Sequence, residues 1–263
     1  MRIISLSPSV TETLVLLGLE DEIVGITPWC RMYLKDPDNK IIVGSYLTIL
    51  WDRIELLKPD IIFLQSRVQD KLFWILKEKG FNTFLIPLPT NVYSIISHIV
   101  IDVGSIVGRY YEAREIAERL IEAIARIRVK AFDFKNRLRT YIEYLWPDKS
   151  FSSAGSLTYI DDMIRIAGGE NIFRDYALEF FAPTDLDIIK KDPQIILVNI
   201  EPVMKNINIE RYLEIRPILK NSTAYKYQRI FLVQESKELN LAHFGPSFIK
   251  TIEWIYGLYR RFS

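Results

Sequence analysis

The stretch Asp52–Leu64, DRIELLKPDIIFL, decides the fold, because a similar stretch returns at Asp185–Val198 as DLDIIKKDPQIILV. Each copy reads as a short helix with an acidic start, a proline that ends the helix, and a buried strand. Uninterrupted apolar strands that alternate with amphipathic helices are typical of a parallel sheet covered on both faces. The two copies therefore predict an α/β protein with two similar lobes, each built on a mostly parallel sheet flanked by helices.

The start of the chain repeats this alternation. Arg2–Leu6 reads as a short buried strand, and Ser9 and Glu12 after it have the spacing of a capping box that begins a helix. A strand that leads directly into a helix is the first unit of such a lobe.

A long helical pattern lies between the two copies. Ala113 to about Ala131 carries a stripe of apolar residues with a polar back. About 20 helical residues span about 30 Å, enough for one long rigid helix to join two lobes, and an ordinary surface helix of the first lobe is the alternative. We expect an N-terminal lobe over 1–108, a connecting helix over 109–135 and a C-terminal lobe over 136–263.

The composition excludes several classes of protein. The 263 residues include 34 basic and 33 acidic side chains, so the formal net charge of +1 gives no field that favours nucleic acid or anionic lipid. No apolar run approaches the ~18 residues of a membrane span, and the first residues do not read as a signal peptide. We expect a cytoplasmic protein as the sequence stands, and an extracytoplasmic or membrane-tethered one if a signal or anchor was removed.

The sequence contains no motif for catalysis or for a resident cofactor. The phosphate-binding, nucleophile-elbow, zinc-protease and dinucleotide patterns are all absent. The two histidines, His98 and His243, lie far apart, and the single cysteine, Cys30, has no nearby partner. We therefore expect no enzyme, no protein-held metal and no intrinsic cofactor.

The turns after the strands are the expected ligand-binding positions, because ligands of open parallel sheets bind at the carboxyl ends of the strands. These turns are rich in aromatic, small and single polar residues, which suits a large and partly flat ligand. The residues that we expect to contact it are Pro8, Ser9, Trp29, Tyr33, Ser45, Tyr46, Gln65 and Arg67 in the first half, and Trp146, Gly155, Ser156, Glu201, His243 and Phe244 in the second.

Each of these residues has a structural alternative. Pro8 and Ser9 suit a helix start whatever the function, and Gly155 would serve only a turn. The turn aromatics are equally compatible with the edge of a core. Glu201 would either accept hydrogen bonds from a ligand or cap the end of its own strand, and His243 would be either a ligand contact or a solvated side chain.

Three segments carry a family resemblance that extends over nearly the whole chain: Arg2–Glu12, Leu57–Ile62 and Ala167–Phe173. The chain resembles the helical-backbone (type III) substrate-binding proteins of ABC importers for cobalamin, haem and iron-siderophores, and most of all the cobalamin-binding branch. The resemblance implies two lobes joined by one long helix, a ligand held edgewise in the cleft between them, and an ABC permease as partner. It also implies ligand contacts in the turn after the first strand and in the loops at Ser45–Tyr46, Gln65–Arg67 and His243–Phe244.

The sequence departs from this family at two points. The surface glutamates with which such proteins dock on a transporter have no clear equivalents, Asp70 and Asp185 being merely nearby acids. His243 stands where relatives commonly have an arginine or another polar residue. The resulting interpretation is a binding protein for a corrinoid, cobalamin-like, or for haem, an iron-siderophore or another metal chelate. The alternatives are an intracellular corrinoid or haem carrier or sensor, and an enzyme on the same two-lobed scaffold.

Overall fold

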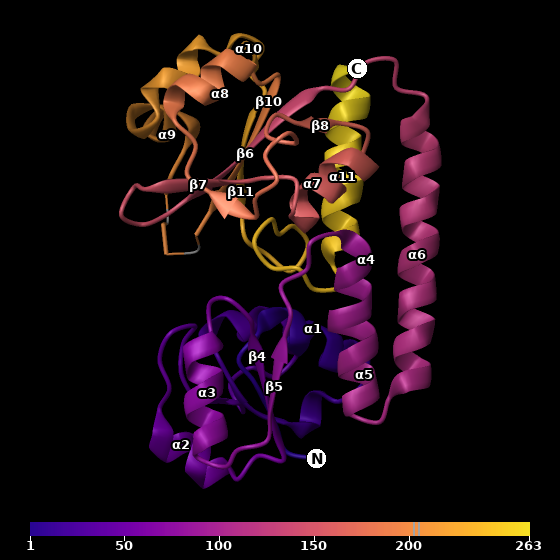
Figure 1. Cartoon of the computed structure of the whole chain (residues 1–263), viewed down its shortest axis with the longest axis vertical. Coiled ribbons are helices and arrows are strands. Elements are labelled where there is room, and N and C mark those ends of the chain that lie inside the picture. Colours follow the sequence, from indigo (N-terminus) through magenta and orange to yellow (C-terminus); the bar gives the residue numbers. More distant parts are fainter. Residues whose placement is uncertain (202, 205) are drawn as a thin grey trace. The chain divides into compact units, whose positions relative to one another are not determined.

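The computed structural model describes residues 1–201, 203–204 and 206–263, which form two compact units (Figure 1). Unit 1 comprises Met1–Pro89 and Tyr93–Ile121, and unit 2 comprises Thr90–Val92 and Glu122–Ser263. The division falls inside helix α6 (Tyr110–Phe132), where the sequence predicts a long helix. The boundaries 1–108, 109–135 and 136–263 themselves stay a prediction. Among the described residues, no helix is both long enough and apolar enough to cross a membrane.

Unit 1 is built on a sheet with the strand order β3-β2-β1-β4-β5, in which every neighbouring pair is parallel. Its elements in chain order are β1 (Ile3–Ser5), α1 (Pro8–Leu16), η1 (Glu20–Glu22), β2 (Ile23–Ile26), η2 (Pro28–Tyr33), β3 (Ile41–Ile42), α2 (Trp51–Leu57), β4 (Ile61–Gln65), α3 (Asp70–Glu78), β5 (Thr83–Ile86), α4 (Val92–Ile95), the π-helical η3 (Ile96–Asp102), α5 (Val103–Ile106) and the first part of α6. The strand order turns back between β1 and β4, which is where open α/β sheets bind ligands.

Alternate residues of the central strands separate the two faces of this sheet. Ile4 of β1 and Ile62 of β4 pack in one buried cluster with Ile54 of α2 and Leu76 of α3. Ile3 and Phe63 have the opposite parity and are equally buried. Helices α1 and α5 pack on each other. Both faces are therefore covered, as the uninterrupted apolar strands predict.

Unit 2 is built on a sheet with the order β11-β10-β6-β7-β9, with β8 also paired to β6. Its elements are the last part of α6, β6 (Arg139–Leu145), β7 (Phe151–Ala154), α7 (Tyr159–Ile166), β8 (Glu170–Asn171), β9 (Phe180–Phe181), α8 (Asp185–Lys191), β10 (Ile195–Ile200), α9 (Ile209–Ile215), η4 (Pro217–Asn221), α10 (Thr223–Lys226), β11 (Ile230–Gln234) and α11 (Phe248–Phe262).

The second sheet is not wholly parallel. Strands β6, β10, β11 and β8 run parallel, whereas β7 is antiparallel to β6 and β9 is antiparallel to β7. The prediction of a mostly parallel sheet in each half is confirmed, and the β7–β9 part of the second sheet is the antiparallel exception. Only residues 146–150 connect β6 to β7. A parallel crossover needs a dozen residues or more, so this connection can only form a hairpin.

The repeated segment has the same structure in both units. Helices α2 and α8 each end at a residue with left-handed backbone, Lys58 (φ 43°) and Asp192 (φ 42°), and a proline and a strand follow in each case. The strands that follow, β4 in unit 1 and β10 in unit 2, are both buried along their whole length. The prediction of an acid-started helix, a proline and a buried strand is confirmed at both places.

The capping-box prediction at the first helix is wrong. Helix α1 begins at Pro8, so its N-cap is Ser7, and Ser9 and Glu12 lie inside the helix. Proline is favoured at the first helical position because it has no N–H that would need a partner there and its φ is already helical. Thr11 Oγ1 and Thr13 Oγ1 instead donate to the carbonyl oxygens of Ser7 and Ser9, at 3.1 and 3.2 Å.

Unit 2 buries an ion pair on one face of its sheet. Glu143 of β6 is fully buried and accepts hydrogen bonds from Tyr141 Oη, Tyr212 Oη and Arg216 Nε at 2.8–3.0 Å. Arg216 Nη1 also donates to Asp185 at 2.7 Å. Burial raises the pKa of the Glu143 carboxyl, and the Arg216 guanidinium opposes that rise. This pair joins β6 to the segment after α9 and to the start of α8.

Candidate functional site

Unit 1 gathers small neutral polar groups where β1 and β2 end. Ser5 Oγ donates to Ser7 O at 2.9 Å and accepts from Thr11 Oγ1 at 2.8 Å. Cys30 Sγ lies 3.2 Å from Thr27 Oγ1 and donates to Ser5 O at 3.5 Å. Burial raises the pKa of the Cys30 thiol above its ordinary value, so the thiol stays neutral. These contacts fix the turn after β1 against η2.

A glutamine joins the turns after β1 and β4. Gln69 Oε1 accepts from Gln65 N at 2.7 Å, and Gln69 Nε2 donates to Leu6 O at 3.3 Å. Arg67 has left-handed backbone (φ 71°), and its N–H donates to Asp70 Oδ1 at 2.8 Å at the start of α3. Gln65 and Arg67 were predicted from the sequence, but Gln69, which accepts from the N–H of Gln65, was missed.

The structure brings two predicted aromatic residues of unit 1 together. The rings of Trp29 and Tyr46 lie 5.2 Å apart at 62°, in edge-to-face contact, and both are partly exposed. Ser45 Oγ lies 2.8 Å from Thr48 Oγ1 and accepts from the N–H groups of Leu47 and Thr48, so it holds its own loop. Four other predicted residues of this unit are buried: Pro8, Ser9, Tyr33 and Gln65.

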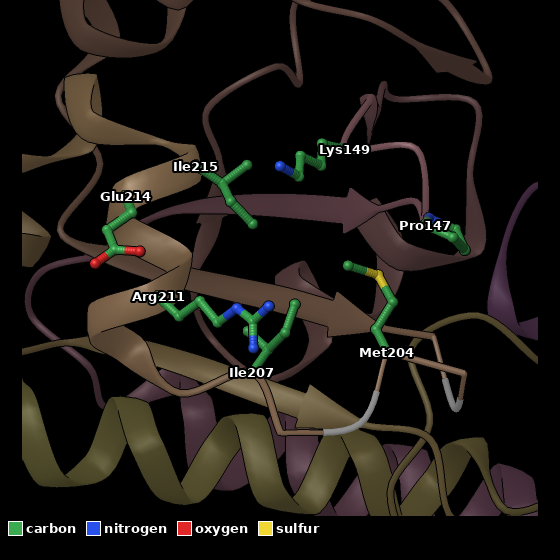
Figure 2. A pocket seen from close by; sticks show the side chains of 7 residues that line it. All are labelled: Pro147, Lys149, Met204, Ile207, Arg211, Glu214 and Ile215. Carbon is green, nitrogen blue, oxygen red and sulfur yellow. The ribbon is translucent and has the colours of Figure 1, made fainter.

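In unit 2, the hairpin between β6 and β7 borders a pocket of about 660 Å³ (Figure 2). The hairpin contributes Pro147 and Lys149, the segment before α9 contributes Met204 and Ile207, and α9 contributes Arg211, Glu214 and Ile215. Trp146, which precedes the hairpin turn, is 40% exposed and donates from Nε1 to Ser152 Oγ at 3.3 Å. The predicted Trp146 therefore lies at the carboxyl end of β6 with an accessible ring face.

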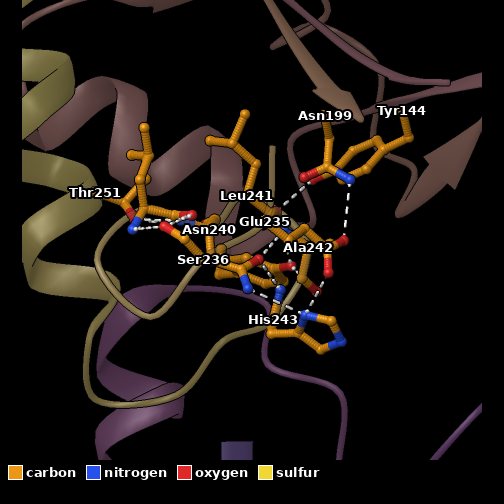
Figure 3. A network of polar contacts seen from close by, with 11 residues as sticks. Tyr144, Asn199, Glu235, Ser236, Asn240, Leu241, Ala242, His243 and Thr251 are labelled. Atoms are coloured by element: carbon orange, nitrogen blue, oxygen red, sulfur yellow. Dashed lines mark hydrogen bonds and ion pairs between the residues drawn. The ribbon is translucent and has the colours of Figure 1, made fainter. Parts of the chain in front are cut away.

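Two predicted residues of unit 2, Glu201 and His243, belong to one electrostatic cluster around Glu235. Figure 3 shows the contacts of Glu235 with His243 and Asn199. His243 Nδ1 lies 3.2 Å from Glu235 Oε2, and Asn199 Nδ2 donates to Glu235 Oε1 at 3.2 Å. Burial raises the pKa of the Glu201 carboxyl; the nearby Glu235 adds to the rise and His243 opposes it. Pro202, which follows Glu201 in the predicted turn, lies outside the described residues.

The loop that carries His243 is held by side chains from distant elements. Asn240 Oδ1 accepts from the N–H groups of Ala242 and His243, both at 2.8 Å. Tyr144 Oη donates to Leu241 O at 3.0 Å, and Tyr159 Oη donates to Ala242 O at 3.0 Å. Phe244 is buried, and its ring lies 5.1 Å from that of Tyr159. A loop fixed at so many points is preorganised for whatever it contacts.

Gly155 and Ser156 do not lie at the sheet edge where the sequence places them. They follow β7, which runs antiparallel to β6, so they do not share the edge at which β6, β10 and β11 end. A Cβ at Gly155 would lie 2.5 Å from Leu178 O, and Ser156 Oγ donates to Tyr176 O at 3.0 Å. Both residues serve the close approach of the 176–179 segment.

Sequence reasoning missed Glu235, Asn240, Tyr144 and Tyr159. Glu235 follows β11 as Glu201 follows β10, so the same rule would have found it. No local signal marks Tyr144 or Tyr159. Within the described part of the chain, no three His, Cys, Asp or Glu side chains cluster so as to hold a metal ion. The acids considered for docking, Asp70 and Asp185, accept from Arg67 N and Arg216 Nη1.

Comparison with known proteins identifies the family. Residues 3–236 match the family model described as periplasmic binding protein. The chain belongs to the periplasmic binding protein family. The family is one of binding proteins, in agreement with the expectation of a receptor without catalytic activity.

Two curated relatives have informative names. The cobalamin-binding protein of Halobacterium salinarum is 22% identical over 228 residues, which cover 85% of this chain and 60% of the relative. The vitamin B12-binding protein of Yersinia pestis is 27% identical over 203 residues, which cover 75% of this chain and 69% of the relative. The chain thus spans about 60% of the length of the first relative and about 69% of the second.

Solved structures confirm the predicted fold class. The apo form of the periplasmic heme-binding protein RhuT from Roseiflexus sp. RS-1 superposes with a TM-score of 0.84 at 20% identity, covering 99% of this chain and 98% of that one. The periplasmic vitamin B12 binding protein BtuF of Vibrio cholerae gives 0.77 at 18% identity, covering 99% and 96%. Both solved structures therefore share the α/β architecture of this chain.

Proposed function

We propose that this protein is the substrate-binding component of an ABC-type importer and that its cargo is a corrinoid, cobalamin-like, or another bulky metal chelate. Support comes from the family, from relatives named for binding cobalamin or vitamin B12, and from structural neighbours named for binding haem. The chelate is cargo on this proposal and not a cofactor, because the protein would release it unchanged.

The observation that carries the proposal is the Trp29–Tyr46 pair at the carboxyl edge of unit 1. The two rings stand edge to face, 5.2 Å apart, and remain partly exposed. They lie beyond strands β2 and β3, and the hydroxyl and carbonyl groups of the neighbouring turn after β1 are buried, hydrogen-bonded to one another and without formal charge. Such a surface suits the face or rim of a large macrocycle, which offers apolar area and a few polar atoms.

Unit 2 contributes a second aromatic surface at the end of β6. Trp146 is 40% exposed in the protein without ligand. An aromatic side chain that becomes fully buried removes about 150–250 Å² of surface from water, so a ligand that covers Trp146 would gain part of that area. The fixed loop around His243 would lose little conformational freedom on binding, so more of the contact energy would appear as affinity. We propose that the cargo contacts Trp29, Tyr46, Trp146 and the side chains of the Glu201–His243 cluster.

Titration of the purified protein with cyanocobalamin, haem and a ferric siderophore tests this proposal, with visible absorbance and calorimetry as readouts. We expect saturable binding of one of them in the micromolar range or below. Trp29→Ala and Trp146→Ala should each weaken that binding about tenfold, since each removes roughly 1–2 kcal/mol of aromatic contact. Trp74→Ala, at a 58% exposed position on α3, is the matched control. If none of the three chelates binds, the proposal is wrong.

The compartment follows from the same proposal. An importer component meets its cargo outside the cytoplasmic membrane, beside its permease, so we propose an extracytoplasmic location. Fractionation of the native host with an antibody against the protein checks this. Protein found only in the cytosol, with chelate bound, would instead support a carrier or sensor.

A further inference from the structure

The pocket between the β6–β7 hairpin and α9 has an unusual balance of charge. Its lining combines four apolar residues with two cations, Lys149 and Arg211, and one acid, Glu214. Lys149 reaches in from the hairpin and Arg211 from the helix, as Figure 2 shows. The pocket therefore has an apolar wall and a net positive charge.

The two cations differ from six basic residues of unit 2 that form ion pairs. Arg139, Arg165, Arg174, Lys191, Arg216 and Lys250 each form an ion pair with an acid. Within the described ranges, neither Lys149 nor Arg211 has an acid within salt-bridge distance, although Glu214 lies three residues from Arg211 on the same helix. Two unneutralised cations beside one cavity attract an anion.

The backbone at Lys149 supports a role for its side chain. Lys149 has a φ of 65°, in the left-handed region, at a hairpin turn where glycine is the favoured residue. A lysine there strains the turn by about 1 kcal/mol relative to glycine. The strained residue is the one that brings an ammonium group to the pocket.

We propose that this pocket is a binding site for an organic anion, one that carries a carboxylate, sulfonate or phosphate on an apolar body. Lys149 and Arg211 bind the charged group, and Met204, Ile207 and Ile215 pack against the apolar part. The volume of about 660 Å³ lies within the range of about 300–1,000 Å³ that small-molecule sites occupy. The site goes beyond the proposed function, because it does not require a metal chelate.

A pair of fluorescent probes with the same apolar body tests the proposal. The sulfonate 8-anilinonaphthalene-1-sulfonate should bind the wild-type protein saturably, with an affinity that falls as salt is added, whereas neutral N-phenyl-1-naphthylamine should bind at least tenfold more weakly. Lys149→Gln with Arg211→Gln should weaken sulfonate binding at least tenfold and leave the neutral probe unchanged.

Lys220→Gln is the matched control, because it removes one exposed cation of unit 2 that does not line the pocket. Thermal melting of every variant checks that the protein stays folded. The proposal is overturned if the wild type does not bind the sulfonate saturably, or if the double variant binds it as well as wild type does. These outcomes do not depend on whether a chelate binds, so the two proposals fail separately.

The anion has two possible sources, and a second titration distinguishes them. Calorimetry with the sulfonate is repeated on protein saturated with whichever chelate binds. Loss of sulfonate binding assigns the site to an anionic side group of the cargo, and retained binding assigns it to a separate small molecule. Both results keep the site, and they differ only in its natural occupant.

Discussion

Unit 1 and unit 2 repeat one helix–strand segment, and in both an arginine on the neighbouring strand holds it. Arg2 Nε donates to Leu57 O at 2.7 Å, and Arg139 Nε donates to Lys191 O at 3.2 Å. The N–H of each arginine also donates to the side chain after the proline, Asp60 or Gln194. We call these two hydrogen bonds, from the Nε and the N of one arginine, the arginine clamp. Each unit has one.

The two units differ in the charges that they place on this shared framework. Glu143 follows Arg139 at the same spacing as Leu6 follows Arg2, so the two residues occupy equivalent positions in the two units. Both are fully buried. The carboxyl edge of unit 1 contains buried hydroxyl, thiol and amide groups, whereas that of unit 2 contains Glu201, Glu235 and His243. The shared framework therefore constrains the turns and helix ends. It does not constrain which charged side chains lie at the carboxyl edge of each sheet.

Removing the buried cation of unit 2 should have the largest effect. Arg216→Ala leaves the buried Glu143 carboxyl without its cation and should lower the free energy of unfolding by about 3–5 kcal/mol, measured by urea denaturation. The double variant Glu143→Gln with Arg216→Met removes both charges, as in unit 1, and should recover much of the loss. Arg211→Ala, at an exposed position on α9, is the control. A double variant less stable than Arg216→Ala would contradict this account.

Each unit also has a glycine at a close backbone approach. A Cβ at Gly44 would lie 2.2 Å from Thr48 O, and one at Gly155 would lie 2.5 Å from Leu178 O. Alanine at either position should destabilise the protein by roughly 1–3 kcal/mol, since the backbone must move. Gly257→Ala, with open space around it in α11, should be neutral or stabilising. If all three variants melt at the same temperature, the close approaches at Gly44 and Gly155 do not exist in the folded protein.

The clamps themselves should contribute unequally. Arg139 also forms an ion pair with Asp192 at 3.0 Å, and its side chain is 42% exposed, whereas Arg2 lies exposed near the chain start. We expect Arg139→Ala to cost about 1–2 kcal/mol and Arg2→Ala about 0.5–1 kcal/mol. Denaturation midpoints of the two variants measure the difference. A greater loss for Arg2→Ala would reverse the ranking.

The smallest predicted effect concerns Glu201 and has a definite sign. Burial, with Glu235 nearby, raises the pKa of this carboxyl in the folded protein, so the folded state holds the proton more tightly than the unfolded chain. Stability is therefore lost as the pH rises through the interval between the unfolded and folded pKa values. Glu201→Gln should stabilise the protein slightly above that interval and change nothing below it. Thermal melting from acid to neutral pH checks the sign, and destabilisation at neutral pH would contradict it.

Local patterns in the sequence were sufficient for the framework. The apolar runs of β4 and β10 and the stripe along α6 have the periodicity of their elements, and the prolines mark the helix ends. The antiparallel direction of β7 was not predicted. The short connection at 146–150 contained the signal, because a parallel crossover cannot be that short. The sequence thus contained more topology than the apolar pattern alone revealed.

The candidate site was less predictable. Glu201 and His243 could be selected, since each lies in a turn near the end of a predicted element, and the structure joins them through Glu235. The hydroxyls that hold the His243 loop come from Tyr144 and Tyr159, which lie 97 and 82 positions from Leu241 in the chain. Contacts at that separation arise from tertiary packing and leave no periodic trace.

The buried thiol of unit 1 has a practical consequence. Cys30 is inaccessible to solvent, and its raised pKa keeps it in the unreactive thiol form. Maleimide dyes should therefore ignore it in the folded protein while reacting with any cysteine introduced on the surface. The native chain can accept spectroscopic labels at chosen positions without first losing its own cysteine.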